Sequence, residues 1–150
     1  MSVPAAVVLR PAHRRAIADA SLAALPGEAC GLLLGHLDGE RRVITQVRVT
    51  RNALAASRHD RFEIEPAQLL RIHRQARAEG LHVLGHFHSH PNGHGEPSTT
   101  DAAHVYDLGQ LWLIQPIIDD AAGPLTAWLV VRARQVGWPF VGLAIYEEGA

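Results

Sequence analysis

Apolar positions follow two different periods along the chain. Continuous or alternating apolar runs are typical of strands, and they occur at 3–9, 29–35, 41–49, 62–64, 83–87, 111–114, 125–131 and 140–146. Apolar side chains near every third or fourth position predict helices at 14–25, 66–79 and 101–108. Because helices and strands do not strictly alternate, the pattern predicts an α/β protein of the α+β type, with a mixed β-sheet flanked by helices.

Turn-forming residues separate these elements. Pro26-Gly27 and Gly80 are expected to end the first two helices, and Asp38-Gly39 predicts a hairpin between two strands. The stretches 52–61 and 119–124 have no period and predict a loop and a turn. Pro116 cannot donate to a sheet ladder, so the strand that starts at Leu111 is expected to be short or at a sheet edge.

Composition narrows the class of protein. With 150 residues, we expect 1–150 to form a single domain. A net charge of -1 gives no basic surface of the kind that binds nucleic acid, and no apolar run is long enough to predict a membrane partner. The one cysteine, Cys30, cannot form an internal disulfide and is predicted to be a core residue. These features favour a soluble, cytoplasmic protein.

Histidines near the end of the strand at 83–87 are candidate metal ligands. Alternate side chains of a strand share a face, so His88 and His90 should point the same way. The ten residues between His90 and Asp101 are rich in turn formers and can bring Asp101 back over the two imidazoles. Two imidazoles and one carboxylate suit a catalytic zinc ion that keeps one position for water. By parity His82 and His86 share this face and could compete as ligands, as could His94 in the loop.

Ser98 and Asp101 also have an explanation that involves no metal. Ser98-Thr99-Thr100-Asp101 matches a capping box, in which the serine starts a helix and the acid bonds back to the serine backbone. A carboxylate used in this way is poorly placed to bind zinc. The metal-site hypothesis therefore predicts that Asp101 turns toward His88 and His90 instead.

Glu28 is a candidate general base. It directly precedes an apolar run that should be buried, where an ionised carboxylate is costly unless it is paired or functional. Glutamate takes a proton from water in zinc hydrolases. Spacing alone does not choose Glu28 over Glu63, Glu65 or Glu96, and a solvated glutamate after a turn is the simpler interpretation.

Together these residues resemble a known motif. The spacing His-x-His, seven residues, Ser, two residues, Asp is met by His88, His90, Ser98 and Asp101. It resembles the motif of the JAMM (MPN+) zinc metallopeptidases, and the run 28–35 resembles the segment that bears the glutamate of that family. The similarity extends over about residues 7–118, and the chain looks like a small prokaryotic member.

The resemblance implies a fold, a reaction and partners. The fold would be the MPN (JAB/cytidine-deaminase-like) fold. His88, His90 and Asp101 would bind Zn²⁺, Glu28 would activate the water, and Ser98 would stabilise the oxyanion. The reaction would be deubiquitinase-like cleavage after the C-terminal glycine of a ubiquitin-like or sulfur-carrier protein. Activating and conjugating enzymes of a conjugation operon would be further partners.

Two other functions remain open at this point. Two histidines and a carboxylate also form the facial triad of non-haem iron oxygenases. The same fold could also serve as a non-catalytic interaction module. Within the peptidase hypothesis, the scissile bond could lead to a lysine, a free amino acid or a precursor extension.

Overall fold

The strands of the protein pair edge to edge until the sheet closes on itself. The computed structural model describes residues 5–149. The strands are β1 (Ala6–Leu9), β2 (Cys30–Asp38), β3 (Arg41–Thr50), β4 (His82–His90), β5 (Leu111–Ile118), β6 (Ala121–Ala122), β7 (Thr126–Val130) and β8 (Phe140–Glu147). Their order is β4-β2-β3-β1-β8-β7-β5-β6, and β4 also pairs with β5, which closes the barrel. The pairs β1–β3, β1–β8 and β4–β5 are parallel and the others antiparallel, so the predicted mixed sheet is confirmed.

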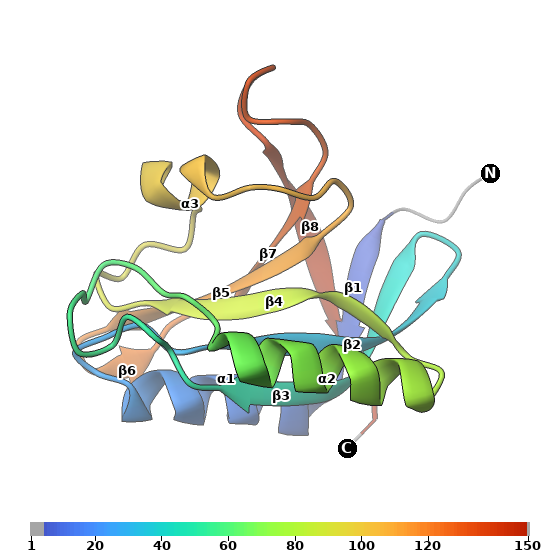
Figure 1. Cartoon of the computed structure of the whole chain (residues 1–150), viewed down its shortest axis with the longest axis horizontal. Coiled ribbons are helices and arrows are strands. Elements are labelled where there is room, and N and C mark those ends of the chain that lie inside the picture. Colours follow the sequence, from blue (N-terminus) through green and yellow to red (C-terminus); the bar gives the residue numbers. More distant parts are fainter. Residues whose placement is uncertain (1–4, 150) are drawn as a thin grey trace.

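Three helices pack on this sheet. They are α1 (Pro11–Ala23), α2 (Pro66–Ala78) and α3 (Thr99–Ala103). In Figure 1, α2 lies in front of β2 and β3, α1 lies behind them, and α3 stands apart from both. The predicted α+β class with flanking helices is therefore the observed one.

The two faces of β2 and β4 contribute to different cores. Leu33 and Phe87 point into the barrel, where they pack with Ile17 of α1. Leu32 points outward and packs with Ile72 of α2. In the ladder between these strands Leu32 pairs with His86, and the next outward pair is Cys30 and His88. The histidines that the sequence singled out therefore belong to the outer face of the barrel wall.

Some predicted elements differ in extent. The third helix ends at Ala103, not at residue 108, and Gly109 lies in the following turn. Of the predicted strand 62–64, only Ile64 pairs, through one isolated bridge to Asn52. The first predicted strand, 3–9, is confirmed from Ala6 to Leu9, and Val3 and Pro4 lie outside the described residues.

Pro116 lies in an interior strand, so the expectation of a short or edge strand was wrong. Strand β5 runs from Leu111 to Ile118 between β4 and β7. Its pairing with β7 ends at Ile114, so Pro116 stands beyond the β7 ladder while it is still paired with His90 of β4. The predicted turn at 119–124 is a tight hairpin in which Ala121 and Ala122 pair back onto β5 as β6.

Two smaller expectations concern burial and membranes. Cys30 is buried and lies next to Thr50 at the start of β2, as predicted for a core residue. Among the residues from 5 to 149, no helix combines the length and apolar character needed to cross a membrane.

Candidate metal centre

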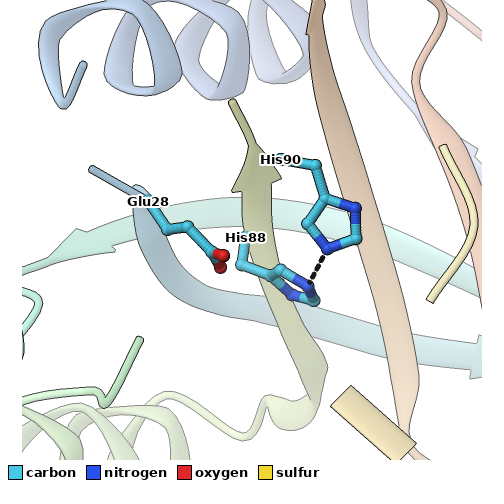
Figure 2. Close-up of side chains that lie close together, drawn as sticks. All are labelled: Glu28, His88 and His90. Atoms are coloured by element: carbon cyan, nitrogen blue, oxygen red, sulfur yellow. Dashed lines mark hydrogen bonds between the residues drawn. The ribbon is translucent and has the colours of Figure 1, made fainter. Parts of the chain in front are cut away.

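Two imidazoles meet at the end of β4. His88 and His90 lie on the same face of the strand, and their Nε2 atoms are 3.1 Å apart. Figure 2 shows both rings turned toward the same space, with the Glu28 carboxylate on the other side of His88. Strand parity had predicted that these two side chains share a face, and both are buried.

Asp101 completes a triangle of nitrogen and oxygen atoms of the kind that bind metals. One of its carboxylate oxygens lies 3.0 Å from His90 Nε2 and the other 3.2 Å from His88 Nε2. Ligands about 2.0–2.1 Å from a tetrahedral zinc ion lie about 3.3 Å from one another. The three side chains thus present donor atoms of the right kind at nearly the separation that such an ion requires.

The capping box and this triangle are both present, so the expectation that they exclude each other was wrong. The backbone N–H of Ser98 donates to Asp101 Oδ2 at 2.8 Å, and the N–H of Asp101 donates to Ser98 Oγ at 2.9 Å. The same Oδ2 faces His90, and Oδ1 faces His88. A carboxylate has enough lone pairs to bond to its own helix start and still point at two imidazoles.

Hydrogen bonds on the far side of each imidazole fix the orientation of its ring. His90 Nδ1 lies 2.9 Å from the carbonyl oxygen of His94, and His88 Nδ1 lies 3.1 Å from His86 Nε2. His94 thus contributes its backbone, and its exposed side chain lies outside the cluster. His82 is exposed because the pairing of β2 with β4 skips Leu84, and this bulge ends the parity that had placed His82 on the same face.

Glu28 lies beside the two histidines. One atom of each of Glu28, His88 and His90 lies within 4.8 Å of the others, and this buried group could hold a metal ion. Glu28 Oε1 is buried, and no other described residue offers it a hydrogen bond. Burial raises the pKa of the Glu28 carboxyl to about 8, although the charge of His90 opposes this shift. A carboxylate that is buried without a partner beside two imidazoles is poised to accept a proton.

The charges within the cluster favour Asp101 as the permanent anion. Burial by itself would raise the pKa of Asp101, but the hydrogen bonds of His88 and His90 outweigh burial and lower it strongly. Burial would also lower the pKa of His90, and the hydrogen bond and charge of Asp101 reverse this effect. For His88 burial dominates and lowers the pKa, which keeps its ring neutral, as a metal ligand must be.

Two polar residues that the sequence did not single out hold Glu28 in place. The N–H of Ala29 donates to Ser89 Oγ at 2.8 Å, and the N–H of Ser89 donates to the carbonyl of Ala29 at 3.1 Å. The side-chain amide of Asn52 donates to the carbonyl of Glu28 at 2.9 Å. Ser89 stands between the two histidines near the end of β4 and is fully buried, whereas nothing in the aperiodic stretch 52–61 marked Asn52.

Aromatic rings and a cavity border the cluster. Phe62 stacks on His88 with ring centroids 4.6 Å apart, and Trp112 lies 4.5 Å from His86. A cavity of about 460 Å³ opens beside Asp101 and His86, between the loop 54–63 and residues 100–110. Asp101 lines this cavity, whereas the buried His88, His90 and Glu28 lie behind its lining residues.

Comparisons with known proteins agree with this architecture. Residues 10–134 match the family described as prokaryotic homologs of the JAB domain. A desampylase of Haloferax volcanii is 32% identical over 89 residues, which cover 59% of this chain and 62% of that protein. A desampylase of Pyrococcus furiosus is 32% identical over 109 residues, which cover 73% of this chain and 71% of that protein.

Solved structures resemble the fold over nearly the whole chain. A protein of Desulfitobacterium hafniense has a TM-score of 0.78 at 26% identity and covers 95% of this chain and 94% of its own. A protein of Salinibacter ruber has a TM-score of 0.70 at 26% identity, with 94% and 90% covered. A JAB1/MPN domain protein of Archaeoglobus fulgidus, with a TM-score of 0.54 at 19% identity and 96% and 98% covered, supports the fold alone.

Proposed function

Because the chain belongs to the prokaryotic JAB-domain family, we propose that it is a zinc metallopeptidase acting on ubiquitin-like proteins. It cleaves the bond that follows the C-terminal glycine of a ubiquitin-like or sulfur-carrier protein. The observation that carries the proposal is the convergence of His88 Nε2, His90 Nε2 and both Asp101 oxygens, with the Glu28 carboxylate beside them. Two distantly similar desampylases favour the same class of reaction.

The residues that would hold the metal are His88, His90 and Asp101. Zinc held by two imidazoles and one carboxylate acts as a Lewis acid that activates water and polarises a carbonyl group. Glu28 could serve as a fourth ligand, since it lies within 4.8 Å of both histidines. Its partner-free oxygen and raised pKa fit a proton acceptor better, whereas Asp101 remains ionised between two imidazoles.

Glu28 and Ser98 supply the chemistry around the metal. The Glu28 carboxylate takes a proton from the attacking water and passes it to the leaving amine. Ser98 Oγ already accepts the N–H of Asp101, so its hydroxyl proton is free to donate to the oxyanion that forms at the scissile carbonyl. The cavity beside Asp101 has room for the polypeptide that approaches the cluster.

The substrate assignment rests on the relatives. The chain spans about 62% of the length of the Haloferax desampylase, and the similarity is distant. The proposal therefore names a class of carrier, a ubiquitin-like protein with a C-terminal glycine. Enzymes that activate and conjugate this carrier are the further partners proposed, and the cytoplasm is the proposed compartment.

Replacement of the base tests the mechanism. Glu28→Gln keeps the size of the side chain but cannot accept the proton, so hydrolysis should fall about 10²- to 10⁴-fold while bound zinc stays near one per chain. Glu40→Gln is the matched control, because Glu40 is exposed in the hairpin between β2 and β3 and lies outside both the cluster and the cavity. Full activity in Glu28→Gln would remove Glu28 from the mechanism, and its loss of zinc would make Glu28 a ligand.

The substrate class is tested by mass spectrometry. Ubiquitin-like proteins from the same genome, extended beyond their terminal glycine, are incubated with the protein with and without a chelator. A product that ends in the carrier glycine, and that disappears with the chelator, is expected. Turnover that needs iron and oxygen would support the oxygenase alternative, and binding without turnover would support the interaction module.

A further inference from the structure

One histidine of the cluster is outside the triangle of metal-binding atoms. His86 lies two residues before His88 on the outer face of β4, where it pairs with Leu32 of β2 and Trp112 of β5. Its Nε2 is 3.1 Å from His88 Nδ1. It therefore contacts the edge of the His88 ring that faces away from Asp101 and His90.

The positions of the protons follow from this arrangement. His88 Nε2 points at the triangle, where a metal requires its lone pair, so the proton of the neutral ring must be on Nδ1. This Nδ1–H can donate only to an atom that offers a lone pair. His86 Nε2 is the atom in that place, which makes His86 an acceptor with its own proton on Nδ1.

Packing on several sides holds the acceptor in place. Trp112 and Phe62 have ring centroids 4.5 and 5.1 Å from that of His86. Phe62 also covers His88, so both imidazoles are held against the same aromatic ring. An acceptor held in this way limits rotation of the His88 ring even before a metal binds.

The second ligand provides a comparison within the same site. His90 directs its Nδ1 at the backbone carbonyl of His94, which is a usual partner for a metal-bound histidine. His88 lies within a strand that is paired on both sides, where backbone carbonyls point along the sheet and not at the ring. A side chain must therefore supply its acceptor.

We propose that His86 is the positioning residue of the metal centre, which accepts the Nδ1–H of His88 and so keeps His88 Nε2 directed at the ion. This inference rests on the proposed function, because it requires the three-ligand metal centre. It adds a role for a residue outside the ligand set, the base and the oxyanion donor. His86 does not bind the ion and does not contact the substrate bond.

The zinc affinity of two variants at position 86 tests whether His86 is the acceptor for His88. His86→Phe keeps a ring between Trp112 and Phe62 but removes the lone pair, and Zn²⁺ binding measured by chelator competition should weaken about 10- to 100-fold. His86→Gln places an amide oxygen near the former Nε2 and should restore affinity to within a few-fold of wild type. His82→Phe, on the same strand but exposed, should leave affinity unchanged.

Nuclear magnetic resonance of the wild-type protein tests the same point without a substitution. In the Zn²⁺-loaded protein, imidazole ¹⁵N–¹H correlation spectra should show His88 protonated at Nδ1 and His86 unprotonated at Nε2. This readout also decides the matter if His86→Phe does not fold. The metal alone fixes the proton of His88, whereas a merely structural role would not require His86 Nε2 to be unprotonated, and a proton on that atom would overturn the inference.

The outcomes separate this inference from the proposed function. Wild-type protein that binds no Zn²⁺ would overturn the metal centre and the role of His86 with it. Wild-type protein that binds Zn²⁺ while His86→Phe binds it equally well would overturn the role of His86 alone. Equal losses in His86→Phe and His86→Gln would also overturn it, because the acceptor would then not be the feature that matters.

Discussion

At the scale of single residues, carboxylates in this protein bond to the backbone at two helix starts. Asp101 does so at α3 while it faces two imidazoles. Glu65 does so at α2, where its oxygens accept the N–H groups of Ala67 and Gln68. The Asp101 carboxylate thus belongs to the candidate site. The Glu65 carboxylate stabilises the start of α2, the helix that covers the outer face of β2 and β4.

Glu65 gives the protein a pH-dependent element of stability. The hydrogen bonds from Ala67 and Gln68 lower the pKa of the Glu65 carboxyl. A carboxyl with a lowered pKa in the folded state stabilises that state above its unfolded pKa of about 4.5, and the contribution is lost as the pH falls through the folded value. Glu65→Ala should therefore lower the melting temperature by a few degrees at pH 7, and less as the pH falls below about 4.5.

Glu63→Ala is the control for this measurement. Glu63 is exposed, and among the described residues its carboxylate has no hydrogen-bond or ion-pair partner. The melting temperature of Glu63→Ala should therefore equal that of wild type at each pH. If Glu65→Ala lowers the melting temperature as much at pH 3 as at pH 7, the ionised Glu65 carboxylate is not the source of the stabilisation.

Residue identity predicted much of the candidate site. The spacing of His88, His90 and Asp101 placed these side chains together, and the structure brings them together. The sequence predicted a conflict between the capping box and the metal site, and this prediction was wrong. It assumed that the Asp101 carboxylate has a single partner, whereas its two oxygens meet the Ser98 N–H and both imidazoles. The contact of Asn52 with Glu28 could not be predicted, because a loop without a period gives no register from which to place it.

At the scale of elements, β4 depends on a close approach to β5. Gly85 stands opposite Leu111, and a Cβ at this position would lie 1.8 Å from the Leu111 carbonyl oxygen. The strand that carries both histidines can therefore pair with β5 only if this residue has no side chain. Gly142 in β8 has no such restriction, because the heavy atom nearest to a Cβ at that position would be 3.8 Å away, on Trp128.

This difference predicts the outcome of two matched substitutions. Gly85→Ala should destabilise the protein by about 3 kcal/mol or more, because the new methyl group meets backbone that cannot rotate away. Gly142→Ala should change stability by less than about 1 kcal/mol. Urea denaturation measures both, and equal effects would mean that β4 and β5 are not as close as described.

Element boundaries were harder to predict than element types. The helix expected at 101–108 stops at Ala103, because the chain turns there to bury Val105 against Trp112. The bulge at Leu84 and the passage of β5 through Pro116 depend on which strands are neighbours. Since neighbours are set by the closure of the barrel, a reading of local periods could not predict them.

At the scale of the whole molecule, the metal should act as a stabilising ligand. Its proposed ligands come from β4 and α3, and Glu28 precedes β2, so the ion joins segments that are distant in sequence. A ligand that binds only the folded state at 100 times its dissociation constant adds about 2.7 kcal/mol of stability. This stabilisation by zinc needs no change of fold.

Zinc should accordingly raise the melting temperature. At 100 times the dissociation constant the expected rise is about 5–10 °C, measured by calorimetry with zinc and then with excess chelator. Asp101→Asn retains an oxygen for the Ser98 N–H but loses the anionic ligand, so its rise should be much smaller. A rise in Asp101→Asn as large as in wild type would place the ion elsewhere.

The family and the fold are thus established at this scale, whereas the extent of the domain, 1–150, and the cytoplasmic location stay predictions. The resemblance rested on a few motif residues, and the match of residues 10–134 to the family bears it out. The loops and helix ends that shape the cavity lie outside the motif, so the motif does not describe them.

The pairing of β4 with neighbours on both sides has a consequence for self-association. A strand at the border of an open sheet offers unpaired amides and carbonyls to other chains, and this is a common route to aggregation. The strand with the two proposed histidine ligands has no such border, since β2 and β5 occupy both of its sides. The segment of the protein richest in imidazoles is therefore also protected from acting as a template for fibril growth.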